Sequence, residues 1–151
     1  MIMDYYALAP EVAGALGERT VMDSSVHPPL VARLHYEIDY GWLGDELLEA
    51  FPCYIVSDTI AANLAESGLG AFELHDADVT LTPEAQEDRA GEPVPLFRWL
   101  RVSGIAGRDD LGVTGGGRLV VSERTLALLR TGVLDHCDAD PYLADEARPP
   151  R

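Results

Sequence analysis

The chain has 151 residues, enough for one ordinary domain, and carries a formal net charge of −15, with 26 acidic residues against 11 basic ones that are all arginine. Hydrophobic residues make up 47% of it, so it can bury a core without disulfides, and two cysteines, Cys53 and Cys137, are too few for a disulfide scaffold. This charge repels nucleic acids and anionic lipids, and it favours a basic protein partner or simply solubility.

No basic segment followed by an apolar stretch marks a signal peptide at the N-terminus. No apolar run approaches the roughly 20 residues that cross a bilayer. We therefore expect a cytoplasmic protein that contacts neither membrane nor nucleic acid.

The first third of the chain is predicted to form strands. Residues 3–8 are typical of a short strand, and residues 10–17 of a loop or a brief helical turn. Residues 30–38 alternate in polarity, which predicts one half-buried strand. Its apolar face would consist of Leu30, Ala32, Leu34, Tyr36 and Ile38.

The next segment is predicted to alternate between helix and strand. Residues 44–51 (GDELLEAF) are a candidate for a short helix, and residues 54–56 for a buried strand. Ser57 or Asp58 then caps a helix to about Glu66, because their oxygens accept the free N–H groups of a first helical turn.

Alternation returns further along the chain. Residues 71–81 alternate in polarity, with Phe72 and Leu74 and then Val79 and Leu81 as apolar positions, and predict strand. Thr82 is predicted to cap a short acidic helix, with Pro83 at its first position. Residues 89–95 are expected to form a loop.

The C-terminal third repeats the pattern. Residues 96–102 are predicted to be a strand, residues 103–117 a glycine-rich turn or hairpin loop, and residues 119–121 a buried strand. Ser122 is expected to cap the helix that follows. These elements predict an α+β fold in a single domain over residues 1–138, with a mixed or mostly antiparallel sheet, a few short helices and a flexible tail at 139–151.

Residues 54–69 and 119–133 have matching patterns: a buried strand, a serine cap followed by an acid, a short helix and a glycine. One interpretation is an internal duplication. The other is that any capped strand–helix unit ending in glycine shows this pattern.

The acidic charge is concentrated in the middle of the chain. Residues 37–92 contain 14 acids against one base, Arg89, whereas residues 98–130 carry six arginines against three acids. The segment 40–43 (YGWL) has the aromatic character of an interface anchor, although Trp42 would also suit the core. The predicted partner-binding residues are Trp42, Asp45, Glu46, Glu49, Asp76 and Asp78, facing a basic protein partner.

The sequence offers no recognisable catalytic or metal-binding motif, so we expect no catalytic residues, no metal and no cofactor. His35 is expected on the surface, opposite the apolar face of its strand. An alternative is a small hydrolase or metal-dependent enzyme that uses His35, His75 or His136 with nearby acids. A second alternative is a structural subunit of a larger assembly.

Residues 97–104 (FRWLRVSG), a glycine-rich loop, residues 119–124 (LVVSER) and a short leucine-rich helix resemble immunity proteins of bacterial polymorphic toxin systems. The likeness covers about residues 97–138, with a similar unit at 54–69. It implies tight binding to a cognate toxin domain, without catalysis or a cofactor. Such families bind through variable surfaces, so the resemblance assigns no functional residue.

Overall fold

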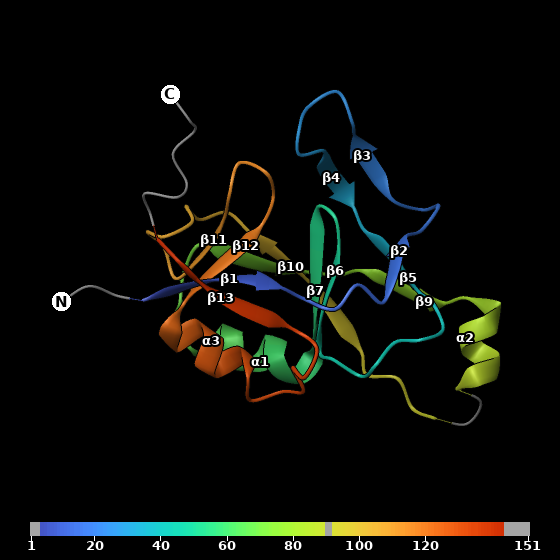
Figure 1. Ribbon diagram of the computed structural model, residues 1–151. Coiled ribbons are helices and arrows are strands. Elements are labelled where there is room, and N and C mark those ends of the chain that lie inside the picture. The colour runs from blue at the N-terminus through green and yellow to red at the C-terminus, as the bar shows by residue number, and fades with distance from the viewer. Residues whose placement is uncertain (1–3, 90–91, 144–151) are drawn as a thin grey trace.

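A computed structural model describes residues 4–89 and 92–143 of the chain (Figure 1). The described part contains two four-stranded sheets, a three-stranded sheet and a two-stranded hairpin, with three short helices. All paired strands are antiparallel except one pair, so the α+β prediction with a mostly antiparallel sheet is confirmed. None of the helices is long and apolar enough to cross a membrane in this part of the chain.

The first four-stranded sheet has the order β6-β7-β10-β8. Its strands are β6 (Leu47–Ala50), β7 (Cys53–Ser57), β10 (Phe97–Val102) and β8 (Phe72–His75). β7 continues into α1 (Asp58–Glu66), and the Ser57 hydroxyl accepts a hydrogen bond from the Ile60 N–H as the predicted N-cap.

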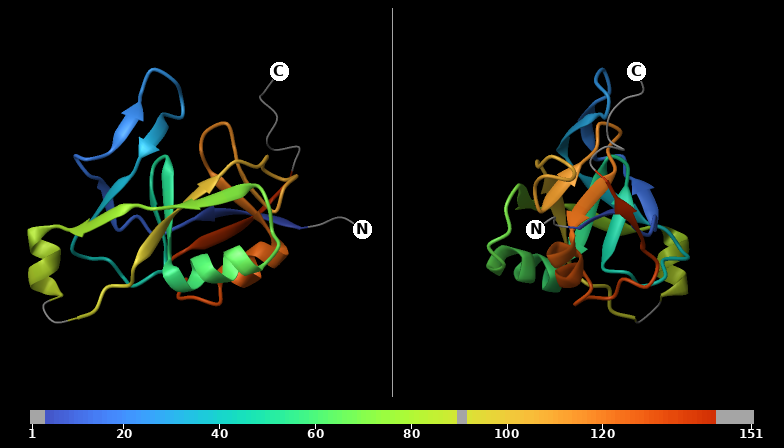
Figure 2. Two further views of the ribbon diagram at one scale, coloured as in Figure 1. Left: turned by 180° about the vertical axis from the view of Figure 1, so that it is seen from behind. Right: turned by 60° about the vertical axis from the view of Figure 1, so that its left-hand side comes forward.

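The second four-stranded sheet has the order β11-β12-β1-β13. Its strands are β11 (Leu111–Val113), β12 (Leu119–Ser122), β1 (Tyr5–Ala9) and β13 (Asp138–Tyr142). β12 continues into α3 (Glu123–Leu129), which Ser122 caps. The helices α1 and α3 lie side by side (Figure 1 and Figure 2).

The smaller sheets lie toward the other end of the molecule. The three-stranded sheet consists of β2 (Gly14–Leu16), β5 (His35–Ile38) and β9 (Asp78–Leu81), and β5 and β9 are parallel. α2 (Pro83–Asp88) follows β9 and is capped by Thr82 as predicted. The hairpin of β3 (Val21–Asp23) and β4 (Leu30–Arg33) projects from the rest of the chain (Figure 2).

Both faces of the first sheet are buried. Leu47 and Val56 belong to the apolar cluster that includes α1 and α3, whereas Leu48 and Ile55 belong to a second cluster that includes β5. Alternating residues of β6 and β7 therefore point into two different cores. β6 accordingly has one polar residue, the half-buried Glu49.

Six element predictions are wrong in part. Residues 71–81 divide into β8 and β9, which belong to different sheets, and residues 103–117 contain the strand β11. Residues 44–51 form β6 rather than a helix, and residues 10–17 contain the strand β2. Residues 30–38 break at Leu34 into β4 and β5, so Val31 rather than Leu30 is buried. Residues 138–142 form β13 on the edge of a sheet instead of a flexible tail; residues 144–151 of that prediction lie outside the described residues.

Candidate functional site

The predicted anchor segment divides into buried and exposed side chains. Trp42 is 5% exposed and Asp45 is 0% exposed, so neither is open to a partner as the sequence predicted. Tyr40 and Leu43 are 67% and 60% exposed. The segment thus presents two apolar side chains to solvent and uses its other residues internally.

Trp42 belongs to the core. Its indole N–H donates to the carbonyl oxygen of Asp45 at 3.1 Å, and its ring meets that of Phe97 edge-on at 5.9 Å. Arg89 lies over the indole ring at 4.4 Å and donates to the Trp42 carbonyl at 2.7 Å. The cation–π contact and the hydrogen bond fix Arg89 inside the structure.

Asp45 holds a distant loop by its carboxylate. Its two oxygens accept the main-chain N–H groups of Asp135 at 3.0 Å and His136 at 2.9 Å. The Nδ1 atom of His136 lies 3.1 Å from Oδ1 of the same carboxylate. A buried carboxylate needs such partners, so the role of Asp45 in the fold explains its burial.

Glu46 and Glu49 are also half-buried. Glu46 accepts hydrogen bonds from the Ser57 hydroxyl at 2.7 Å and from the main-chain N–H of Val133. Burial raises the pKa of Glu49 above its usual value, with an opposing effect from Arg118. The Glu46 carboxylate therefore makes internal contacts, and the half-buried Glu49 is not freely accessible either.

The other two predicted residues lie near β8 and β9. Asp78 forms ion pairs with Arg19 at 3.4 Å and Arg33 at 3.1 Å, which neutralise its charge. The side chain of Asp76 is fully exposed, with Arg98 at 3.8 Å. Of the six predicted residues, Asp76 alone is freely accessible.

A different surface carries exposed apolar and acidic side chains together. We call it the Tyr40 face, and it consists of Val12, Glu37, Asp39, Tyr40 and Leu43. All of these except Leu43 line a hollow of about 320 Å³ between β2 and the start of α2, and its two charged side chains, Glu37 and Asp39, are both acids. Val12 is 66% exposed, like its neighbours Tyr40 and Leu43.

Hydrogen bonds hold the loop of the Tyr40 face in place. The Asp39 N–H donates to the Ala13 carbonyl at 2.8 Å, which extends the β2–β5 pairing. Oδ1 of Asp39 accepts the Tyr40 N–H at 2.8 Å and the Thr82 hydroxyl at 3.0 Å. The Leu43 N–H donates to Glu11 Oε2 at 2.6 Å. Tyr40 and Leu43 are therefore presented by a pre-ordered loop.

The sequence predicted an interface anchor in the segment 40–43, but it did not indicate that Val12, Glu37 and Asp39 belong to the same face. Val12 precedes β2 and lines the same hollow as Tyr40, whereas the sequence predicted a loop or a brief helical turn for residues 10–17. Only the exposed aromatic in an acidic region signalled this surface.

Glu11, Asp45 and His136 could hold a metal ion, because one ligand atom from each lies within 4.8 Å of the others. The two Glu11 oxygens already accept the N–H groups of Leu43 and Asp45. All three side chains thus have partners that order two loops.

The remaining histidines do not join this cluster. His35 is buried at 4% exposure, contrary to the expectation that it lies on the surface, and its ring contacts Thr80 at 2.8 Å. His75 is paired with Glu73 at 3.1 Å on β8. Of the three histidines in the enzyme alternative, His136 is the one that lies in a cluster with two carboxylates, those of Glu11 and Asp45.

Comparison with models of known protein families, with curated proteins and with solved structures gives no match for the chain.

Proposed function

We propose that the chain is a non-catalytic protein-binding protein that docks a basic partner on the Tyr40 face. The observation that carries this proposal is that two exposed apolar side chains, Val12 and Tyr40, line a hollow whose charged side chains are both acids, with the exposed Leu43 in the same loop as Tyr40. Protein interfaces combine aromatic and aliphatic anchors with a charged rim in this way.

The charge of the chain favours a basic partner. Residues 37–92 carry 14 acids, and their only base, Arg89, is occupied by Trp42 and Glu92. The excess negative charge attracts a cationic surface over distances longer than a hydrogen bond. Association would be accelerated by this field more than the final complex is tightened.

The specific role that we propose is that of an immunity protein, which binds and neutralises a cognate bacterial toxin. This step rests on the resemblance of residues 97–138 and 54–69 to such proteins. An inhibitor needs a stable, pre-ordered surface, and the hydrogen bonds of Asp39 and Glu11 supply one.

The test is co-expression with the product of the gene that lies directly upstream of this one. We expect that product to arrest growth by itself, and growth to recover when this chain is present. The two proteins should also elute together in size-exclusion chromatography.

Two variants test whether the partner binds at the Tyr40 face. Tyr40→Ser should weaken the complex by about tenfold or more, because anchor residues commonly contribute over 1 kcal/mol. Leu96→Ser, which removes an equally exposed apolar side chain elsewhere, should leave binding unchanged. A neighbour that is not toxic, or a complex unaffected by Tyr40→Ser, would contradict the immunity role and the docking face respectively.

A further inference from the structure

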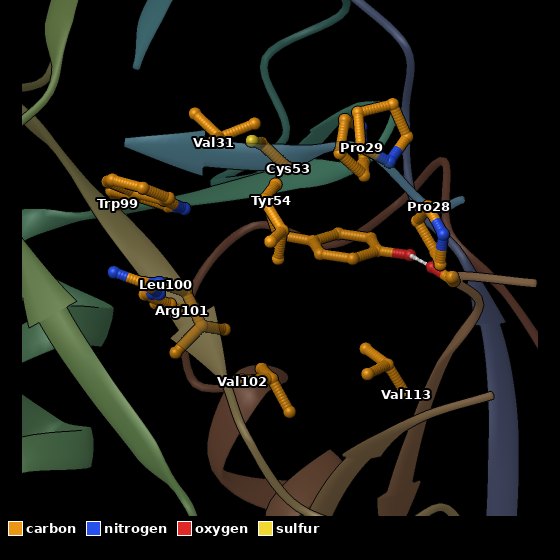
Figure 3. A pocket seen from close by; sticks show the side chains of 13 residues that line it. Pro28, Pro29, Val31, Cys53, Tyr54, Trp99, Leu100, Arg101, Val102 and Val113 are labelled. Atoms are coloured by element: carbon orange, nitrogen blue, oxygen red, sulfur yellow. Dashed lines mark hydrogen bonds between the residues drawn. The ribbon is translucent and has the colours of Figure 1, made fainter. Parts of the chain in front are cut away.

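An apolar groove of about 210 Å³ lies between the projecting β3–β4 hairpin and β10 (Figure 3). Its walls come from four strands that are distant in sequence, and Val31, Tyr54, Trp99 and Val113 contribute apolar side chains to them. The groove shares no residue with the Tyr40 face. The side chains of the groove itself therefore determine what it can bind.

One end of the groove is firmly built. The Tyr54 side chain reaches across toward Pro28, and its hydroxyl donates to the carbonyl oxygen of Gly117 at 2.7 Å (Figure 3). Gly117 is packed so closely that an added Cβ would lie 2.7 Å from the ring of Phe51 and 3.5 Å from Pro28. These contacts place the turn of the hairpin, which contains Pro28, against the loop of Gly117, so the hollow is preformed.

Apolar surface continues from the groove onto the hairpin. Leu30 lines the groove yet is largely exposed, and Met22, which pairs with Val31 across the hairpin, is exposed as well. A contiguous apolar surface that extends beyond a cavity is typical of a site for a protein segment. A small molecule would be enclosed and would leave the hairpin uncovered.

Arg101 gives the groove a charge. It is exposed, and its guanidinium lies 5.4 Å from the centre of the Trp99 ring. Six of the nine arginines between residues 4 and 143 pair with acids of the chain, whereas Arg101 forms no ion pair or hydrogen bond with any described residue. A free cation on the wall of an apolar groove, in a chain with 26 acids, is complementary to a carboxylate from outside.

We propose that this groove binds an extended segment of a partner protein in which apolar side chains flank a glutamate or aspartate. The apolar side chains fill the space between the hairpin and β10, and the acidic side chain pairs with Arg101. The site differs in charge from the Tyr40 face, and it does not depend on that face being a docking surface.

The test uses the full chain labelled with ¹⁵N and two capped peptides, acetyl-Gly-Leu-Glu-Phe-Gly-amide and the same peptide with Gln in place of Glu. The two indole N–H resonances separate the sites, because Trp99 lines the groove and Trp42 does not. We expect a saturable shift of the Trp99 resonance alone. The Glu peptide should bind about three- to fivefold more tightly than the Gln peptide, as for a partly exposed ion pair.

Matched variants assign the preference to one guanidinium. Arg101→Gln should abolish the preference for Glu, whereas Arg108→Gln, which removes another exposed arginine, should keep it. Equal affinity of the wild-type chain for both peptides would overturn the proposal, and so would a preference that survives Arg101→Gln. A Trp99 resonance that does not move up to the solubility limit of the peptides would also overturn it. The Tyr40→Ser variant tests the Tyr40 face, whereas the peptides test this groove. Either proposal can therefore fail without the other.

Discussion

The Ser57 hydroxyl donates a hydrogen bond to the Glu46 carboxylate at 2.7 Å, and the main-chain N–H of Ser57 donates to the Glu46 carbonyl at 2.9 Å. Ser122 makes the same two bonds to Asp110, again at 2.7 and 2.9 Å. Each acid directly precedes the first strand of a hairpin, and each serine ends the second strand and caps a helix. In each unit, the serine side chain thus links the end of a strand, the first turn of a helix and the acidic residue that precedes the hairpin.

The two four-stranded sheets match beyond these caps. Phe97, the first residue of β10, pairs with Ser57, and Tyr5, the first residue of β1, pairs with Ser122. In each sheet the fourth strand lies on the far side of this third strand. Independent capped helices would explain the serines but not the shared register, so this arrangement favours the predicted internal repeat.

Removing either serine hydroxyl should destabilise the chain. Ser57→Ala and Ser122→Ala are each expected to lower the free energy of unfolding by about 1–3 kcal/mol, because a helix cap and a buried acceptor both lose a partner. Thr82→Ala removes a similar cap on the more exposed α2 and should cost less. Urea unfolding followed by circular dichroism measures all three, and an equal loss in Thr82→Ala would contradict the role of the half-buried carboxylates of Glu46 and Asp110.

Asp110 should make stability depend on pH in the acid range. Hydrogen bonds of 2.8 and 2.7 Å from the Arg124 guanidinium, joined by one from Ser122, hold the pKa of this carboxyl below its usual value. A lowered pKa in the folded state stabilises the protein above the unfolded pKa of about 3.9, and the contribution is lost as pH falls through the folded pKa.

The variant Asp110→Asn should therefore be less stable than the wild type at neutral pH and should lose less stability on acidification. Thermal unfolding across a pH series measures this difference. Asp76→Asn, in which the carboxylate is fully exposed, serves as the control and should follow the wild-type profile. Parallel pH profiles for Asp110→Asn and the wild type would refute the assignment.

Gly117 packs close to Phe51 and to Pro28 in the turn of the β3–β4 hairpin. Its φ of +91° lies in the left-handed region, and an added Cβ would collide with Phe51. Gly117→Ala should lower the free energy of unfolding by about 1–3 kcal/mol. Gly115→Ala, in the same loop but with open space around it, should change stability by less than about 0.5 kcal/mol. Similar losses in both would show that the loop repacks freely.

The elements that sequence predicted well are those with local signals. A serine or threonine cap and an apolar helix face lie within ten residues of each other, so α1, α2 and α3 were found. β6 was mistaken for a helix because Leu47 and Leu48 are buried in opposite cores, which removes the alternation expected of a strand. β13 was missed because Pro141 lies in it, which an edge strand tolerates.

The site was harder to predict for a similar reason. Charge density suggested that Asp45 is exposed, but long-range contacts with residues 135 and 136 decide its burial. No local pattern shows which acids will accept main-chain N–H groups from a segment 90 residues away. Tyr40 was within the segment of interest, yet its neighbour Val12 depends on a pairing that only the fold reveals.

A variant of Asp45 also distinguishes a structural role of this residue from the enzyme alternative. Asp45→Ala should lower the free energy of unfolding by about 3 kcal/mol, since it leaves buried N–H groups without an acceptor. EDTA should leave the melting temperature of the wild type unchanged. Zinc bound at one equivalent and lost in His136→Ala would instead assign Glu11, Asp45 and His136 to a metal centre.

The rate at which the partner binds should depend on salt concentration. If the Tyr40 face meets a basic surface, the association rate constant should fall by about tenfold or more between low and high salt. The reason is that the Debye length shrinks from about 10 Å at 0.1 M to about 3 Å at 1 M, which screens the attraction between the two proteins before contact. Dissociation, which depends on short-range packing of Tyr40 and Leu43, should change much less.

Variants of the acids test the same point. Glu37→Gln with Asp39→Asn keeps the size of the side chains and an acceptor oxygen for the Tyr40 N–H, but removes two charges from the face. This pair should slow association at low salt and flatten its salt dependence. Glu18→Gln with Glu66→Gln removes the same charge from exposed positions outside the face and should have a smaller effect. Stopped-flow or surface-plasmon measurements give the rates, and a salt-independent association unaffected by the first pair would mean that the acidity serves solubility alone.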